Sequence, residues 1–427
     1  MLTILEMAAA LLAATAAACL INAKALKFPV AVGTMIVGLA VTALVAGAEL
    51  LRPDLGAGAV YSAWVGRIDY PKLVLDFLLA YLLFAGAMNV NLTALARRGW
   101  AVAILATLGT VVTAGLMAGG FWLVARLVGY DLPVAWAVVF GTLISPTDPI
   151  AVLAMTKRTA LDEEVRAQLE GEALFNDGVA VVLFRAALAF AVAQGSGAVD
   201  PLEMVGHVAT EALGGALLGL VGGLVGVAII YAVDDWGTEL LITLAVATGV
   251  YALAAHLHLS GPIGVVCAGL VAGSKWARGG MAEPTRRYVF PFWHMVDEAM
   301  NAVLFFVLGL VAWNLKAEPG HLWLAAAAPA LLLAARWIAI ALPSAALPLV
   351  RRRASVKLIN VLTWAGVRGG LSAAMALSLP ESPQKQMILA GTLGVVVFSM
   401  IVQSMTMEGL AVRTGYGVRR TEPEPTH

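Results

Sequence analysis

The residues best suited to chemistry lie in the segment 171–178, inside an apolar run from about residue 165 to residue 193. Glu172, Asn176 and Asp177 place two carboxylates and a carboxamide in that run. Ionisable groups at such a depth in a membrane are energetically costly and usually mark ion pathways or proton relays. A membrane helix with a purely structural role does not require them. The segment is therefore the candidate functional site.

The composition defines the environment of this segment. Hydrophobic residues make up 61% of the 427 residues and charged residues 13%, against about 45–50% and about 25% in soluble domains. The chain is therefore predicted to be a multi-pass membrane protein. Its formal net charge is zero, which argues against a nucleic-acid partner.

Apolar runs of about 20 residues, the length that a helix needs to cross a bilayer, predict an all-α fold of about thirteen transmembrane spans. The least certain pair covers residues 240–272. The spans are expected to begin near residues 3, 28, 71, 99, 132, 164, 203, 239, 261, 288, 321, 356 and 387.

The distribution of positive charge predicts the orientation. With the N-terminus outside, the predicted inside segments hold roughly three times as many Lys and Arg residues as the outside segments. We therefore expect an N-out, C-in protein of a bacterial-type inner membrane. Residues 414–427, with Pro423 and Pro425, are expected to be a short, disordered cytoplasmic tail.

The fifth predicted span contains Ser145, Pro146, Thr147, Asp148 and Pro149 in succession. Each proline removes a backbone donor and clashes with the preceding turn, so the helix should break here. Irregular backbone at this depth is tolerated only where it lines a cavity or is buried in protein. An ordinary proline kink would explain the prolines but not the aspartate between them.

The twelfth span is expected to break as well, because Gly366, Gly369 and Gly370 surround Arg368. Close helix packing would explain the glycines but not the arginine. The two broken helices lie seven spans apart and so run in opposite directions. This pattern predicts an inverted repeat of spans 1–6 and 8–13, linked by span 7, with the broken helices of spans 5 and 12 crossing at a binding site.

The helical positions suggest different roles for the two carboxylates. Asp177 points about 140° away from Glu172 around the helix. We expect Arg368 to form an ion pair with Glu172, because a buried charge needs a partner. Asp177 would then have no fixed cation. It would hold either a proton or a metal cation, and competition between the two would couple their movements.

Hard oxygen ligands suit an alkali cation at such a site. The expected ligands are the Asp177 carboxylate, the Thr147 oxygen atoms and groups near Asp148. Asn176 and Ser145 are expected to support the site, Asn176 as a cap of a half-helix. For Glu170, a role in a cytoplasmic funnel competes with that of a solvated residue at the helix entrance.

Outside these motifs, Asp297 and Glu298 lie near the start of a predicted span, and we expect them at the membrane–water interface. Asn301, one turn further along, is a weaker functional candidate that would face the core.

Together, the Ser145 to Pro149 motif, the Glu172 to Gly178 motif and the glycine-rich motif 366–372 resemble those of monovalent cation/proton antiporters of the sodium/proton exchanger (NhaP-like) type. The resemblance covers nearly the whole chain and implies an antiporter domain over residues 1–413. It implies a homodimer in which a core of spans 4–6 and 11–13 moves, in an elevator-like cycle, against a dimer domain of spans 1–3 and 7–10.

The resemblance also implies site roles. Asp177 corresponds to the transport carboxylate, Thr147 to a ligand, and Glu172 with Arg368 to a structural ion pair. The Asn176–Asp177 pair resembles the electroneutral branch, which exchanges one proton for one Na⁺ or Li⁺, with no cofactor. Ala173 departs from the family, whose close members carry a serine ligand there, so a K⁺/H⁺ antiporter remains an alternative. A cation channel and an intramembrane aspartyl protease using Asp148 and Asp177 are more remote alternatives.

Overall fold

The protein is described by a computed structural model for residues 4–148, 159–193, 201–233, 235–281, 283–315, 318–346 and 355–419. These residues form an almost entirely helical bundle, which confirms the predicted fold class. Within them, ten helices are long and apolar enough to cross a membrane. A helix satisfies its own backbone hydrogen bonds, which lipid cannot do, so apolar segments of this length fold as helices.

The first half of the chain supplies the helices up to the first break. They are α1 (Ile4–Ile21), α2 (Val30–Leu51), α3 (Ala57–Val65), α4 (Tyr70–Lys72), α5 (Leu79–Asn89), α6 (Leu92–Ile104), α7 (Thr110–Leu127) and α8 (Val134–Leu143). Short π-helical segments at Asn22–Leu26, Leu73–Leu78 and Leu105–Gly109 interrupt or join these helices, and Pro53–Leu55 forms a 3₁₀ turn.

The remaining helices follow a short strand, β1 (Thr159–Leu161). They are α10 (Glu163–Ala193), α11 (Pro201–Ile230), α12 (Trp236–His256), α13 (Gly261–Ala272), α14 (Lys275–Gly280), α15 (Glu283–Val311), α16 (Pro319–Ala346), α18 (Val356–Trp364), α19 (Gly370–Leu377), α20 (Pro383–Phe398) and α21 (Ser404–Thr414). Ala312–Asn314 forms a 3₁₀ turn, Ser399–Gln403 is π-helical, and the second strand is β2 (Gly417–Arg419).

Helix boundaries follow local capping signals. The Asn91 side chain accepts hydrogen bonds from the backbone of Thr93 and Ala94 at the start of α6. Ser260, Ser355 and Ser382 cap α13, α18 and α20 in the same manner. Such side chains satisfy backbone donors that have no partner inside the helix.

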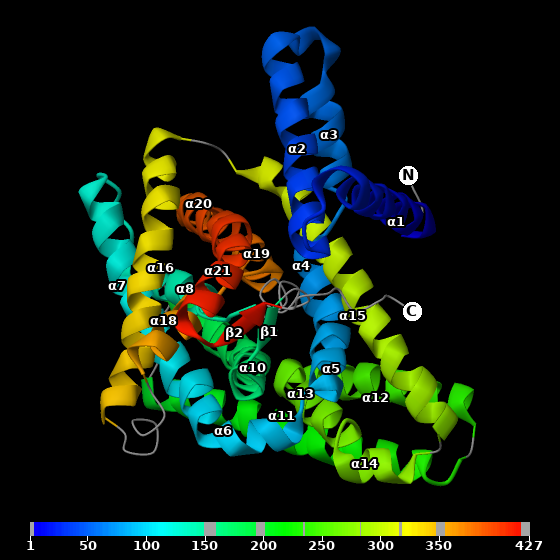
Figure 1. Ribbon diagram of the computed structural model, residues 1–427. Coiled ribbons are helices and arrows are strands. Elements are labelled where there is room, and N and C mark those ends of the chain that lie inside the picture. Colours follow the sequence, from blue (N-terminus) through cyan, green and yellow to red (C-terminus); the bar gives the residue numbers. More distant parts are fainter. Residues whose placement is uncertain are drawn as a thin grey trace.

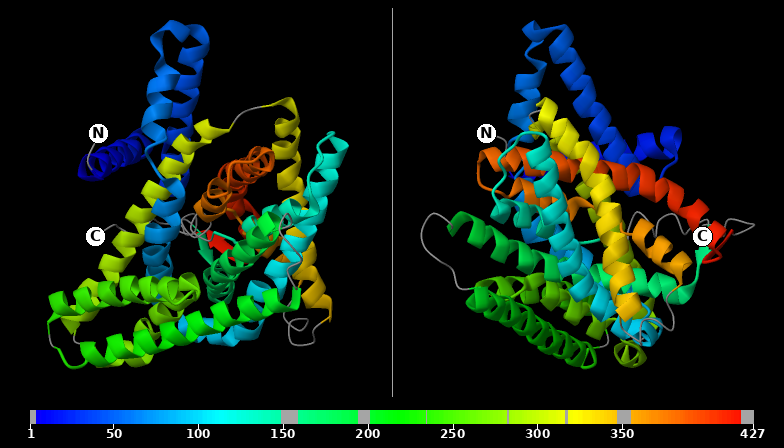
Figure 2. Two further views of the ribbon diagram at one scale, coloured as in Figure 1. Left: turned by 180° about the vertical axis from the view of Figure 1, so that it is seen from behind. Right: turned by 90° about the vertical axis from the view of Figure 1, so that its left-hand side faces the viewer.

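The helices pack in two groups (Figures 1 and 2). In one group, α15 packs on α2 and α5, while α13 packs on α5, α11 and α12. In the other, α10 packs on α6 and α8, α16 packs on α7, α18 and α20, and α19 packs on α20. Contacts of α10 with α13 and of α15 with α19 connect the groups. The carboxylate-bearing helix α10 therefore lies where the groups meet.

The start of the predicted tail is ordered, contrary to the expectation of disorder. Strand β2 pairs antiparallel with β1, with Ala160 opposite Val418. The backbone N–H of Asp162 also donates to the carbonyl of Tyr416. The start of the tail therefore pairs, as a strand, with the segment that precedes α10. Its last residues, 420–427, including Pro423 and Pro425, lie outside the described residues.

Candidate functional site

The first predicted break is present. Helix α8 ends at Leu143, and Ser145 to Thr147 are buried without regular secondary structure. The Ser145 hydroxyl donates back to the carbonyl of Thr142 at 2.8 Å, which satisfies one of the freed acceptors. Pro149 lies outside the described residues.

The second predicted break separates α18 from α19, at residues 365–369. Its glycines provide space for charged side chains. A Cβ atom on Gly369 would collide with the Asp148 carboxylate, and one on Gly366 would lie 2.8 Å from Nε of Arg336. The glycines therefore admit two charged side chains as well as a close helix contact.

The two breaks meet in space. The N–H of Asp148 donates to the carbonyl of Val367 at 2.8 Å, so the backbones of the interrupted helices are directly hydrogen-bonded. Arg368, which is fully buried, donates from Nε to the carbonyl of Ile144 at 2.6 Å and from Nη1 to that of Gly366 at 2.8 Å. These carbonyls belong to helix C-terminal ends, whose partial negative charge favours a guanidinium.

The predicted pair of Glu172 with Arg368 is therefore wrong. Glu172 forms its ion pair with Arg336 of α16, and both side chains are buried. The physical reason is that the Arg368 guanidinium donates to carbonyls at both breaks. The Arg336 side chain instead passes close to Gly366, which has no side chain to block it, and reaches Glu172 on α10. Arg368 still joins the two broken helices, as expected, but through backbone acceptors.

Asn176 connects α10 to the first break. Its Nδ2 donates to the Thr147 hydroxyl oxygen at 2.6 Å, and its Oδ1 accepts from the Thr147 backbone N–H at 3.2 Å. Asn176 and Thr147 are both buried. This pair of bonds satisfies an orphan backbone donor and places a hydroxyl beside the residue that precedes Asp177.

Asp177 differs from these neighbours. Within the described part of the chain, its carboxylate makes no hydrogen bond or ion pair, although it is only partly accessible. Asp148 and Arg368 lie within electrostatic range of it, one repelling and one attracting its charge. Asp177 is thus close to an arginine that donates to two carbonyls from Nε and Nη1 and whose Nη2 has no hydrogen-bond partner among the described residues.

Two further positions on α10 were singled out by the sequence. Glu170 forms an i,i+4 ion pair with Arg166 at 2.8 Å, and the exposed fractions of the two side chains are 15% and 54%. The carboxylate thus already has a cation and is mostly buried, so the funnel role and the solvated helix-entrance role both stay predictions. Ala173 is buried, so a serine hydroxyl there would have been enclosed.

Sequence reasoning missed the roles of Arg336 and Tyr70. Arg336 lies within an apolar span, where an arginine requires a carboxylate partner, and that signal could have found it. Tyr70 is buried, and its hydroxyl donates to the carbonyl of Gly370 at 3.3 Å, at the first residue of α19. Only the tertiary structure reveals this contact.

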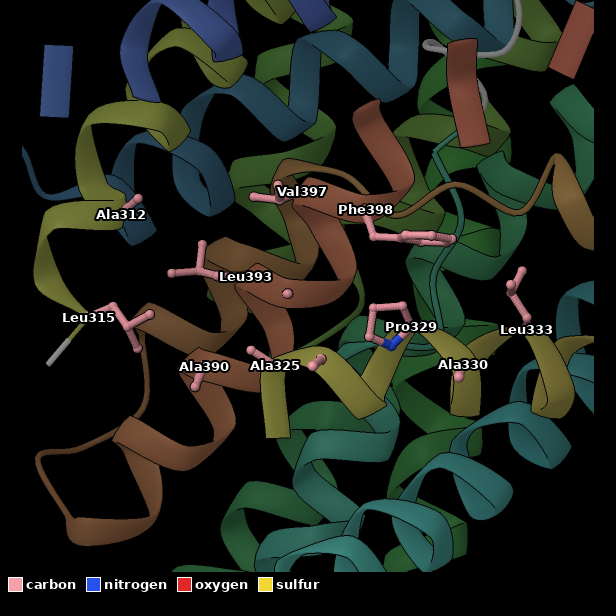
Figure 3. A pocket seen from close by; sticks show the side chains of 12 residues that line it. Ala312, Leu315, Ala325, Pro329, Ala330, Leu333, Ala390, Leu393, Val397 and Phe398 are labelled. Carbon is pink, nitrogen blue, oxygen red and sulfur yellow. The ribbon is translucent and has the colours of Figure 1, made fainter. Parts of the chain in front are cut away.

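A separate hollow of about 640 Å³ lies between α16 and α20, beside the 3₁₀ turn at Ala312 (Figure 3). Its lining is apolar and includes Leu315, Pro329, Leu393 and Phe398. Its lining offers no carboxylate for a cation.

This constellation defines a class of protein: a multi-pass membrane protein with two interrupted helices joined through a buried arginine, beside a carboxylate that has no hydrogen bond or ion pair among the described residues. The family described as sodium/hydrogen exchanger, transmembrane, matches residues 10–413. The chain therefore belongs to the sodium/hydrogen exchanger family, as the motifs predicted. This is a family of secondary transporters and not of enzymes.

Individual relatives cover most of the chain. The Na⁺/H⁺ antiporter NhaP of Pseudomonas aeruginosa is 34% identical over 99% of this chain and 100% of its own length. The low-affinity Na⁺/H⁺ antiporter NhaS1 of Synechocystis is 31% identical over 79% of this chain and 64% of its own. The sodium proton antiporter MjNhaP1 of Methanocaldococcus jannaschii has the same fold, with a TM-score of 0.64, 20% identity, and coverage of 90% of this chain and 98% of its own.

Proposed function

We propose that this protein exchanges Na⁺ or Li⁺ for H⁺ by secondary active antiport, with proton and cation competing for Asp177. The observation that carries the proposal is the contrast on α10: Glu172 has an arginine partner, whereas the Asp177 carboxylate has none among the described residues. A carboxylate in this setting is disfavoured when it is both ionised and empty. It therefore releases a proton as it takes up a cation.

The proposed cation ligands are oxygen atoms near Asp177. The Thr147 hydroxyl oxygen is held in place by Asn176 and keeps a second lone pair for a cation. Asp148 contributes negative charge from the adjoining break. Water completes the coordination where Ala173 lacks a hydroxyl. Ser145 and Asn176 support this arrangement, and Arg336 replaces Arg368 as the partner in the structural pair with Glu172.

The transport cycle that we propose is electroneutral, with one proton exchanged for one cation, because one carboxylate serves both. The packing groups support an elevator-like movement of the α6–α8, α10, α16 and α18–α21 group against the group built on α2, α5, α11–α13 and α15. These groups correspond to the core and dimer domains, the latter joining two copies. We place the protein in a bacterial inner membrane, N-terminus outside.

The same site supports one second candidate, K⁺/H⁺ antiport. It is favoured by Ala173, since the loss of a ligand at a compact site weakens selection for a small cation. A single experiment separates the two. Proteoliposomes with an imposed pH gradient are challenged with Na⁺, Li⁺ or K⁺ across a pH series, with and without a membrane potential.

The expected result is collapse of the pH gradient by Na⁺ and Li⁺, at a rate that the membrane potential does not alter. A response to K⁺ alone establishes the second candidate. A rate that follows the membrane potential contradicts the one-to-one exchange.

A further inference from the structure

Helix α15 carries a polar stripe that the proposed function does not use. Asp297, Asn301 and Leu304 are spaced i, i+4 and i+7 and so share one face of the helix. Leu304 identifies where that face points, because a Cβ atom on Gly370 would lie 2.6 Å from its side chain. At Leu304 this face therefore meets the start of α19, beside the crossing of the two breaks. Figure 1 shows α15 passing close to α19.

Asn301 presents an unsatisfied oxygen within this stripe. Its Nδ2 donates to both the backbone carbonyl of Asp297 at 2.8 Å and the Oδ1 of Asp297 at 3.1 Å. Two acceptors on the same side fix the orientation of the carboxamide. The residue is only 3% exposed, and its Oδ1 is buried without a hydrogen-bond partner among the described residues. A buried carbonyl oxygen without a donor is costly unless a ligand fills it.

Electrostatics connects this stripe to the main site. The Asp148 carboxylate acts on the charges of both Asp177 and Asp297. Asp148 is thus within electrostatic range of a carboxylate on α10 and of a carboxylate on α15, two helices of different packing groups. Asp297 lies about 10 Å along α15 from Leu304, toward the end that carries Arg286.

We propose that Asp297 and Asn301 form a second, weaker site that the transported monovalent cation occupies on its way to or from Asp177. The ligands are the Asp297 carboxylate and the Asn301 carboxamide oxygen, with water in the remaining positions. Hard oxygen donors of this kind suit an alkali cation. This inference rests on the proposed antiport function and adds a binding step to it.

The first test compares the reconstituted full-length protein with Asp297→Asn, Asn301→Ala and the matched control Glu298→Gln, which changes the exposed neighbouring carboxylate. We expect Asp297→Asn and Asn301→Ala to raise the apparent KM for Na⁺ about five- to tenfold, with the maximal rate within about twofold of the parent. Glu298→Gln should match the parent, and Asp297→Glu should recover most of the lost affinity.

An apparent KM within about twofold of the parent in both variants overturns the second site. Complete loss of exchange in Asp297→Asn, with an unchanged melting temperature, also overturns it, because that residue would then belong to the main site. If Asp297→Asn does not fold, the Asn301→Ala result decides alone.

A binding measurement separates this inference from the proposed function. Purified protein is equilibrated with radioactive sodium, and the comparison is between Asp177→Asn and the double variant Asp177→Asn/Asp297→Asn. We expect weak residual sodium binding in the single variant and its loss in the double variant. Equal binding by the two contradicts the second site, whether or not the parent transports. Absence of exchange by the parent with every cation refutes only the antiport function.

Discussion

Two acidic residues lie within two turns of helix α10 and have opposite surroundings. Glu172 is buried in an ion pair with Arg336, whose side chain passes close to Gly366. Asp177 lies within electrostatic range of Asp148 and of Arg368, which bonds two carbonyls through Nε and Nη1 and forms no ion pair with Asp177 in the described structure. The comparison separates a carboxylate that has an ion-pair partner built into the fold from one that has none among the described residues. Under the proposed function, the first is structural and the second is the one available for transport.

The largest expected effect comes from Asp177→Asn. This substitution keeps the volume and removes the ionisable group, so exchange should fall by at least about 100-fold, as expected when a group that the mechanism cannot replace is lost. The melting temperature should stay close to that of the parent, because no hydrogen bond or ion pair of the described structure is removed. Transport in proteoliposomes and thermal unfolding in detergent provide the two readouts. Robust sodium-driven proton movement by this variant refutes the assignment.

Glu172→Gln or Arg336→Met should give the reverse pattern. Each leaves one buried charge unpaired, which typically costs about 3–5 kcal/mol of stability. The double variant Glu172→Gln/Arg336→Met should regain much of that loss, since neither charge remains. The measurement is thermal unfolding of all three variants.

The same cycle checks the corrected pairing. A cycle of Glu172→Gln with Arg368→Met should show weaker coupling than the cycle with Arg336. Stronger coupling to Arg368 would restore the partner that the sequence suggested and contradict the structure.

A smaller effect is expected at the contact between α10 and the first break. Asn176→Ala removes both bonds to Thr147 and leaves a buried backbone N–H unpaired, at a cost of about 1–3 kcal/mol. The apparent KM for Na⁺ should also rise, because the Thr147 hydroxyl loses its support. If Asn176→Ala changes neither quantity, the Asn176–Thr147 contact has no role in the site.

The smallest effect concerns a helix end outside the membrane. Hydrogen bonds from the side chain and backbone of Thr238 lower the pKa of the Asp235 carboxyl at the N-terminus of α12. A lowered folded-state pKa contributes stability that is present above the unfolded value of about 3.9 and is lost as the pH falls through the folded value.

Asp235→Ala should therefore lower the melting temperature slightly at neutral pH. The difference from the parent should shrink as the pH falls below the unfolded value of about 3.9 and through the lower folded value. A difference that is the same over this pH range would show that the carboxylate charge is not responsible.

The sequence predicted the fold well because its signals are local. Apolar length located the helices, and the prolines and glycines around Asp148 and Arg368 located both breaks, since each acts through its own backbone. The inverted repeat and the exact number of spans stay predictions.

The partners of charged groups could not be predicted in the same way. Arg336 and Arg368 are both intramembrane arginines, and only the three-dimensional arrangement shows that carbonyls engage one and Glu172 engages the other. The pairing of β1 with β2 joins segments more than 250 residues apart, and three-residue strands carry no clear pattern in sequence.

Proton release on cation binding tests the central claim most directly. Purified protein in weakly buffered detergent solution is titrated with NaCl while the pH is recorded, and choline chloride serves as the control for ionic strength. The parent should release close to one proton per sodium ion bound, and Asp177→Asn should release none. Equal proton release by the two proteins would show that sodium and hydrogen ions do not compete at Asp177.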